Sequence, residues 1–236
     1  MLERAERLLA SIETSLLRAS ISAGLARRRV AKYHGERHKL STAWEDFFTQ
    51  PLDLENYIDR LDLFRELCSN RRVLHVGCVD WPIFDPKRNL HLQLSAFAGE
   101  LTGLDNNEAG LDVLKKHCHG AYFKSTSEVS GTFDVVLVPE VIEHVPNVKS
   151  FLDELDTLSF ERIVFTVPNA FMPPPGRLWN GSHPRKGGMV EVVHPDHKCW
   201  YSPYTLKNTI ASFTPWKITR LGLNNAYHSV FIEALK

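Results

Sequence analysis

Apolar runs of strand length alternate with helical patterns through residues 71–236, and this alternation predicts an α/β domain. The runs "VVLV" at 135–138 and "IVFTV" at 163–167 are almost continuously apolar. Runs of this kind form strands that are buried on both faces of a parallel sheet. Because strands and helices follow each other in turn, we expect right-handed βαβ units and a doubly wound, Rossmann-like sheet.

The periodicity places seven strands and four helices in this domain. We predict strands at 72–77, 100–105, 121–123, 133–139, 162–168, 216–223 and 228–235, and helices at 90–99, 107–118, 148–155 and 202–213. Only a short link containing Asn224 and Asn225 separates the last two strands. A link of this length allows an antiparallel hairpin and excludes a crossover, so the mostly parallel sheet should end in an antiparallel pair.

Residues 1–70 have a different pattern, which predicts a helical N-terminal extension or cap. Leucine and isoleucine recur at helical spacing from Leu2 to Leu17, and the polar face becomes basic between Arg27 and Lys32. We interpret this segment as a helix whose apolar stripe packs on its own domain or on a second copy in a homodimer, rather than on a membrane. A second helix is predicted over 53–68, with Asp53 as its N-cap.

Composition narrows the classes of function. Lys and Arg total 28 and Asp and Glu total 28, so the zero net charge gives no field that would favour nucleic acid or an anionic membrane. No apolar run approaches the roughly 20 residues that span a bilayer. The four cysteines include no CxxC spacing, which favours reduced thiols in a cytoplasmic protein.

The candidate binding site lies where the strands end. In open α/β sheets, ligands bind beyond the carboxyl ends of the strands. Asp105 ends the second strand, and its two carboxylate oxygens suit the two hydroxyls of a ribose. The alternative is that Asp105 only caps the helix that starts near Asn107, because aspartate is favoured at caps. We favour the binding role because of the position of Asp105 in the fold.

The turn after the first strand, "GCVDWP" at 77–82, restricts the cofactor. Gly77 allows a tight exit from the strand and close approach of a ligand. A dinucleotide site would have further glycines where Val79 and Trp81 stand, and Pro82 removes a backbone donor. The turn therefore disfavours a pyrophosphate cofactor such as NAD. A nucleoside cofactor without a phosphate chain is less penalised, because it needs only room and a few backbone contacts.

Five motifs, in this order, resemble class I S-adenosylmethionine-dependent methyltransferases. They are "VLHVGC" at 73–78, "LTGLD" at 101–105, "FDVVLVPEVIEHVPN" at 133–147, "RIVFTVPN" at 162–169 and "HPDHKCWYSPYTL" at 194–206. The resemblance is to small-molecule methyltransferases of the ubiquinone-biosynthesis and polysaccharide or natural-product type. It covers 71–236, and it implies a seven-stranded sheet with an antiparallel last strand, S-adenosylmethionine (SAM) as cofactor, and methyl transfer to a small molecule.

The resemblance also implies which residues hold the cofactor. Gly77, Cys78 and Asp80 match the turn that holds the methionine part, and Asp105, with Asn106 beside it, matches the residue that binds the ribose. Ser125 or Thr126 lies on the adenine side. Glu140 lines the pocket wall, and Glu143 and His144 match a signature pair of the family. His75 stands where the family usually has an acidic residue that helps to hold the amino end of the cofactor, and Val79 and Trp81 replace two glycines. Asp80 either takes the place of the missing acid or is a solvated loop residue.

Methyl transfer from a sulfonium to a hydroxyl needs a base, and histidine suits this task near neutral pH. His194 and His197 are candidates, and Asp196 between them could orient one imidazole. His144 is a third candidate, with an alternative role in a hydrogen bond to backbone at a helix start. Because the sequence offers no third ligand at a suitable spacing, we predict no metal site.

We expect the N-terminal extension and the stretch 171–200 to determine which substrate binds. This stretch is rich in Pro, Gly and His and is too long for an ordinary loop. Trp179, Trp200 and Tyr201 either stack on a substrate or only pack. An alternative to the enzyme is a methyltransferase-like subunit that no longer catalyses and serves binding or assembly. RNA methylation is disfavoured, because "VPEV" stands where an "NPPY"-like motif would follow the fourth strand.

Overall fold

The structure is a computed structural model that describes residues 52–171, 181–183, 188–190 and 194–236. Contacts divide the chain into two compact units, Met1–Leu52 and Asp53–Lys236. The second unit is described below. The predicted N-terminal helix, its basic face and its role in a dimer lie outside the described residues and stay predictions.

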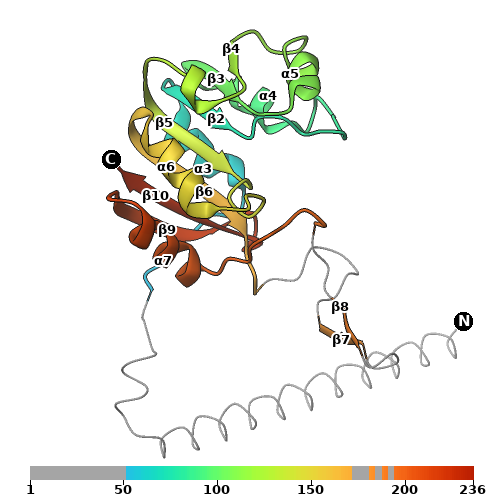
Figure 1. Ribbon diagram of the computed structural model, residues 1–236, viewed down its shortest axis with the longest axis vertical. Coiled ribbons are helices and arrows are strands. Elements are labelled where there is room, and N and C mark those ends of the chain that lie inside the picture. The colour runs from blue at the N-terminus through green and yellow to red at the C-terminus, as the bar shows by residue number, and fades with distance from the viewer. Residues whose placement is uncertain (1–51, 172–180, 184–187, 191–193) are drawn as a thin grey trace, which may run out of the picture. The chain divides into compact units, whose positions relative to one another are not determined.

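A single eight-stranded sheet forms the centre of the second unit (Figure 1). Its strands are β1 (Glu55–Asn56), β2 (Arg72–Val76), β3 (Glu100–Leu104), β4 (Ala121–Phe123), β5 (Thr132–Pro139), β6 (Ser159–Pro168), β9 (Lys217–Asn224) and β10 (Ser229–Leu235). The order across the sheet is β1-β9-β10-β6-β5-β2-β3-β4. Only β10 runs antiparallel to its neighbours, β6 and β9. All seven predicted strands and the antiparallel C-terminal hairpin are thereby confirmed, and β1 is an addition at the edge.

The helices begin at capping residues that the sequence supplies. They are α3 (Arg60–Cys68), α4 (Leu90–Leu94), α5 (Glu108–Leu114), α6 (Val148–Asp156) and α7 (Pro203–Phe213), with a 3₁₀ turn η1 (Thr126–Glu128). Asn89, Asn107, Asn147 and Ser202 each accept a backbone N–H in the first turn of α4, α5, α6 and α7. The helix predicted over 90–99 is only five residues long in the structure.

The segment 53–68 is a short strand followed by a helix, so the prediction of one helix capped by Asp53 is wrong. Helix α3 begins at Arg60, and the carboxylate of Asp59 accepts the N–H of Leu61 at 2.8 Å. The two residues of β1 pair in parallel with β9. Pairing with a sheet edge thus overrides the local helical pattern. This segment belongs to the same compact unit as the sheet, which begins at Asp53 rather than near residue 71.

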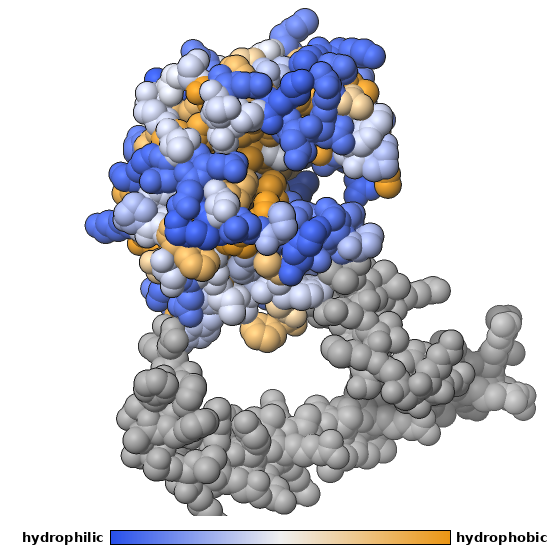
Figure 2. Space-filling view, viewed as in Figure 1, coloured by the Kyte–Doolittle hydropathy of each residue, from blue (hydrophilic) through white to orange (hydrophobic). Residues whose placement is uncertain are grey.

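Buried side chains cover both faces of the sheet, as the continuous apolar runs predict. On one face, α3 and α4 pack on the strands through Leu63, Phe64, Leu67, Leu90 and Leu94 against Val73, Val135, Leu137, Val164 and Phe231. Leu74, Val136 and Phe165 alternate with these positions and are fully buried, so they pack on the opposite face. Helices α3 and α6 lie on opposite sides of the sheet (Figure 1). On the described surface, apolar residues show mainly as strips between hydrophilic ones (Figure 2).

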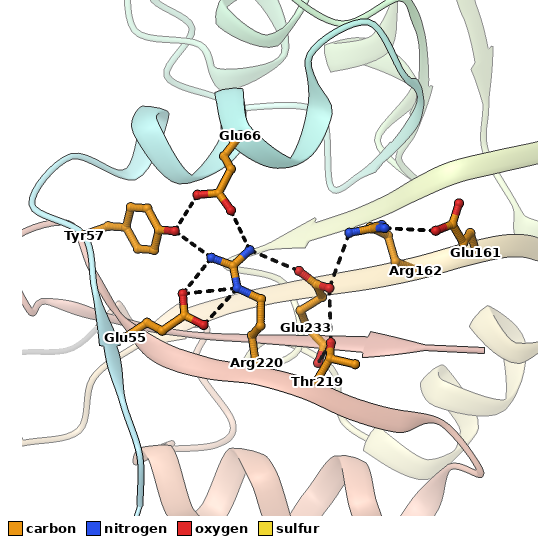
Figure 3. Close-up of polar contacts among 8 residues, drawn as sticks. All are labelled: Glu55, Tyr57, Glu66, Glu161, Arg162, Thr219, Arg220 and Glu233. Atoms are coloured by element: carbon orange, nitrogen blue, oxygen red, sulfur yellow. Dashed lines mark hydrogen bonds and ion pairs between the residues drawn. The ribbon is translucent and has the colours of Figure 1, made fainter.

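Arg220 on β9 ties the first elements of the unit to the last strands (Figure 3). Its guanidinium contacts the carboxylates of Glu55 at 2.7 Å, Glu66 at 2.9 Å and Glu233 at 3.4 Å, and the hydroxyl of Tyr57 at 2.6 Å. Glu233 on β10 is only 4% exposed. A carboxylate this buried needs its partners, so the network fixes β1 and α3 against β9 and β10.

The long stretch 171–200 contains two short strands, β7 (Gly181–His183) and β8 (Gly188–Val190), which form a separate antiparallel pair. Within the described residues, none of the helices combines the length and the apolar character that crossing a membrane requires.

Candidate functional site

The turn after β2 approaches the end of β5 closely. Gly77 has φ +72°, a left-handed conformation that favours glycine. A β-carbon on Gly77 would lie 2.3 Å from Cγ2 of Val141, so a side chain would clash there. Glu140, which follows β5, also has a positive φ of 52°. For a residue other than glycine this conformation costs about 1–2 kcal/mol, and such strain is concentrated at functional sites.

Asp105, directly after β3, connects two neighbouring strand ends. One carboxylate oxygen accepts the backbone N–H of Val79 at 3.1 Å, and the other accepts that of Asn107 at 2.9 Å. The cap of α5 is Asn107, whose side chain accepts the N–H of Gly110 at 2.8 Å. The interpretation of Asp105 as a mere helix cap is therefore wrong. Burial raises the pKa of Asp105, although these two hydrogen bonds partly offset the rise.

Two adjoining cavities open at the carboxyl ends of the strands. The first has a volume of about 500 Å³ and the second about 440 Å³, sizes typical of sites for small ligands. Both are lined by Gly77, Asp105, Asn106, Val141, His144 and Asp196. Asp105 is therefore at the junction of the two. The described surface is hollowed on the side where the strands end, between mostly hydrophilic rims (Figure 2).

Three histidines from distant parts of the sequence meet in the first cavity. The ring centroid of His144 lies 4.6 Å from that of His197 and 5.4 Å from that of His194. The N–H groups of Lys198 and Cys199 donate to the carbonyl of Glu143 at 2.7 Å and 3.2 Å. These bonds hold the segment that begins at 194 against the start of the segment after β5.

Asp196 contacts two histidines of this cluster. The sequence predicted that its carboxylate orients His194 or His197, but in the structure the carboxylate contacts His144. Its carboxylate lies 3.3 Å from Nδ1 of His144. Its backbone N–H donates to Nδ1 of His194 at 3.2 Å. Asp196 therefore fixes the ring of His144 through its side chain and the ring of His194 through its backbone.

Glu143 lies behind the cluster and is only 1% exposed. Its Oε1 is 4.0 Å from Nε2 of His197. Burial raises the pKa of Glu143 to about 8, and the neighbouring charge of Glu140 adds to the rise. Burial likewise lowers the pKa of His197 to about 4, so this imidazole is neutral at pH 7.

Comparison with known proteins bears on the fold. No protein-family model matches the sequence, and no curated protein matches it. Among solved structures, an S-adenosylmethionine-dependent methyltransferase from Mesorhizobium loti superposes with a TM-score of 0.50 at 12% identity, covering 74% of this chain and 96% of that chain. A SAM-dependent methyltransferase from Aquifex aeolicus gives a TM-score of 0.51 at 14% identity, over 74% of this chain and 86% of that one. The chain has the fold of SAM-dependent methyltransferases.

A chain of the Pnkp1/Rnl/Hen1 RNA repair complex shares this methyltransferase fold, with a TM-score of 0.51 at 14% identity. The match covers 75% of this chain and 40% of that chain. At identities this low the likeness establishes the architecture, and the roles of individual residues depend on the geometry of this site.

Most residues predicted to hold a cofactor line the two cavities of the methyltransferase fold. The first is lined by Cys78, Asp80, Glu140 and Glu143 and the second by Ser125 and Thr126, in addition to the shared residues. Asp80 accepts a hydrogen bond from Asn89 at 2.9 Å. The thiol of Cys78 is an exception, because it packs in a buried apolar cluster with Leu111 and Leu114.

The aromatic candidates for substrate stacking differ in their exposure. Trp200 is 38% exposed and lies beside the ring of His197, whereas Tyr201 is only 4% exposed. Packing therefore accounts for Tyr201. Trp179 lies outside the described residues.

Two features of the candidate site and its surroundings were not recognised in the sequence. Arg60, at the start of α3, lines the first cavity, but the prediction placed it in a separate N-terminal extension. His75 and the fully buried His91 form a stacked pair with their Nδ1 atoms 3.2 Å apart. Burial lowers the pKa of His91 to about 4. The run "LHLQL" was correctly assigned to a helix, but no pattern in it shows that His91 faces the core.

Proposed function

We propose that this chain is a SAM-dependent methyltransferase that acts on a hydroxyl of a small molecule. The observation that carries the proposal is the position of Asp105. It follows β3 in a methyltransferase fold, and its carboxylate lies where two cavities join. Each oxygen already accepts one backbone N–H, and each has a second lone pair free for a hydroxyl of a ribose.

The two cavities suit the two ends of such a cofactor. With the ribose at Asp105, the adenine lies toward Ser125 and Thr126 in the second cavity, and the methionine part lies toward the first. There Arg60 supplies a positive charge for the methionine carboxylate, and Asp80 and Glu140 supply acceptors for its ammonium.

The histidine cluster supports a hydroxyl acceptor, because its imidazoles line the cavity that holds the sulfonium end in this arrangement. His197 is neutral at pH 7, so its lone pair is available for the proton, and its pKa of about 4 makes it a weak base. In the reaction, the acceptor oxygen loses its proton and forms a bond to the methyl carbon while the carbon–sulfur bond breaks. The protein contributes chiefly by aligning oxygen, carbon and sulfur.

Isothermal titration calorimetry of the full chain with SAM and with S-adenosylhomocysteine tests the proposal. We expect both ligands to bind, and we expect Asp105→Asn to bind them at least tenfold more weakly, because a hydrogen bond to a charged group contributes about 1.5–3 kcal/mol. Asp112→Asn, at an exposed position on α5, is the matched control and should bind normally.

Circular dichroism and urea unfolding should show that Asp105→Asn is folded. Equal affinity of this folded variant and the wild type would place the cofactor elsewhere. If neither ligand binds to the folded wild-type chain, the methyltransferase proposal fails and the alternative of a non-catalytic binding subunit takes its place.

A further inference from the structure

We propose that the cluster of His144, His194 and His197, together with the carboxylate of Glu143, binds a divalent transition-metal ion. Each imidazole offers one ring nitrogen, and these three atoms all lie within 4.8 Å of one another. The site requires neither SAM nor methyl transfer. It therefore stands or falls separately from the proposed function.

The strongest indication of a missing cation is the environment of Glu143. Its side chain is 1% exposed, and neither carboxylate oxygen has a hydrogen-bond partner among the described residues. A buried polar group without a hydrogen-bond partner is costly, and a cation would compensate the carboxylate in its ionised form. The imidazole of His197 lies near it, with Nε2 4.0 Å from Oε1 of Glu143. A metal ion between these two atoms would satisfy both of them.

Of the three histidines, His144 is oriented as a metal ligand is. A ligating histidine typically donates its second ring N–H to a carboxylate or carbonyl, which fixes the ring and leaves the other nitrogen free. Nδ1 of His144 lies 3.3 Å from the carboxylate of Asp196, so Nε2 of His144 is available for a metal. Nδ1 of His197 is buried and has no partner among the described residues.

His194 is held less favourably. Its Nδ1 accepts the backbone N–H of Asp196 at 3.2 Å, so in the metal-free protein its proton is on Nε2. Binding a metal at either nitrogen displaces this hydrogen bond or this proton. We therefore expect His194 to contribute less to metal affinity than His144 and His197 do.

The donor set selects the class of metal. Imidazole nitrogens favour Zn²⁺, Co²⁺, Ni²⁺ and related ions, whereas Mg²⁺ and Ca²⁺ favour sites made of oxygen ligands. Ligands 2.0–2.1 Å from a tetrahedral Zn²⁺ lie about 3.3 Å apart. The three imidazoles therefore have to move together by about an ångström, which rotation of their side chains can provide.

The position of the ion gives it a role in the proposed reaction, and this step rests on the proposed function. His144 and His197 line the same cavity as Asp105. An ion held there would lower the pKa of an acceptor hydroxyl bound to it, and the proton of this hydroxyl would pass to water. With the ion bound, His197 would hold the metal instead of accepting the proton.

Metal binding by the full chain is the direct test. After removal of metal with a chelator, the protein is titrated with Co²⁺ under visible spectroscopy and with Zn²⁺ in a calorimeter, without SAM. We expect one ion per chain, with the intense visible bands of Co²⁺ bound in a low-coordinate site. His144→Ala, His197→Ala and Glu143→Gln should each weaken binding at least about tenfold, and His194→Ala should weaken it less.

His119→Ala is the matched control, because this histidine is exposed between α5 and β4, and it should bind metal normally. Circular dichroism identifies the variants that fold, and Zn²⁺ should raise the unfolding temperature of the wild type but not that of His197→Ala. The proposal is overturned if the folded wild type takes up no ion, if the ligand variants bind as tightly as the wild type, or if Mg²⁺ binds as tightly as Zn²⁺. SAM calorimetry on metal-free protein reports the proposed function independently.

Discussion

The side chain of Val79 occupies the space that a β-carbon on Gly110 would need. Cγ1 of Val79 lies 2.0 Å from the position of that β-carbon, so the turn after β2 and helix α5 fit together only because residue 110 is glycine. Val79 is also one of the residues that replace the glycines of a dinucleotide-binding turn. The turn thus has valine at position 79 where a dinucleotide-binding turn has glycine, and the glycine at position 110 of α5 leaves room for this valine.

This contact predicts coupling between the two positions. Gly110→Ala should lower the free energy of unfolding by about 1–3 kcal/mol, because it overpacks a close contact. In a Val79→Ala background the same change should cost much less, since the obstructing methyl groups are absent. Urea unfolding of the four proteins measures the coupling as a double-mutant cycle. If the two effects simply add, the contact does not limit residue 110.

Gly77→Ala should destabilise the protein through both strain and steric overlap. The left-handed conformation costs an alanine about 1–2 kcal/mol, and the clash with Val141 adds to this. Gly131→Ala is the matched control, because Gly131 also has a positive φ but has open space around its β-carbon position. Urea unfolding should show a larger loss for Gly77→Ala. Equal losses would mean that the close approach to Val141 is relieved without cost.

The Arg220 network should contribute to stability mainly through Glu233. Arg220→Met removes one of the two guanidinium partners of a buried carboxylate, since Arg162 also contacts Glu233 at 3.4 Å. We expect the free energy of unfolding to fall by about 2–4 kcal/mol, toward the lower end of the loss for a broken buried pair. Lys115→Met breaks an exposed ion pair with Asp112 and should have no measurable effect. A similar small effect of both substitutions in urea unfolding would contradict this account.

The buried pair of His75 and His91 should make stability depend on pH. Burial lowers the pKa of His91 to about 4 and that of His75 well below its ordinary value. Below about pH 6.5 the unfolded chain takes up protons that the folded protein does not. The free energy of unfolding therefore falls as the pH drops from about 6.5 to 4, by about 1.4 kcal/mol per pH unit for each such histidine.

Urea unfolding between pH 4.5 and 7.5 measures this slope. His91→Gln removes one titrating group from the core and should give a flatter profile than the wild type. His119→Gln, at an exposed position, should leave the slope unchanged. An identical slope in His91→Gln and the wild type would show that the pair is not the source of the pH dependence.

The sheet was predictable because its strands have a strong and local signal. Runs such as those of β5 and β6 are apolar at consecutive positions, which fits only a strand covered on both faces. The edge strand β1 has no such signal. Its two residues are exposed. They form a strand because β9 offers an unpaired edge far along the chain, where Glu55 pairs with Gly222 and Asn56 with Leu223.

The site was predictable where position in the fold determines it. Asp105 and Gly77 follow strands and could be selected by that rule alone. The meeting of His144 with His194 and His197 was not predictable, because it depends on the backbone bonds from Lys198 and Cys199 to Glu143. No metal site was predicted because the sequence shows no third ligand near His194 and His197. The third imidazole of the cluster is that of His144, which follows β5 and is far from them in the sequence.

The place of β10 in the sheet has a consequence for how the protein is made. This strand is synthesised after every other strand of the sheet, yet it lies between β6 and β9. Until residues 229–235 leave the ribosome, the edge of β6 has no partner strand. The pair of β1 and β9 is then not connected to the other strands of the sheet, because β10 is the strand that links β9 to β6. The nascent chain is then most exposed to wrong pairing with other chains, and a holdase that shields that edge would raise the yield of native protein.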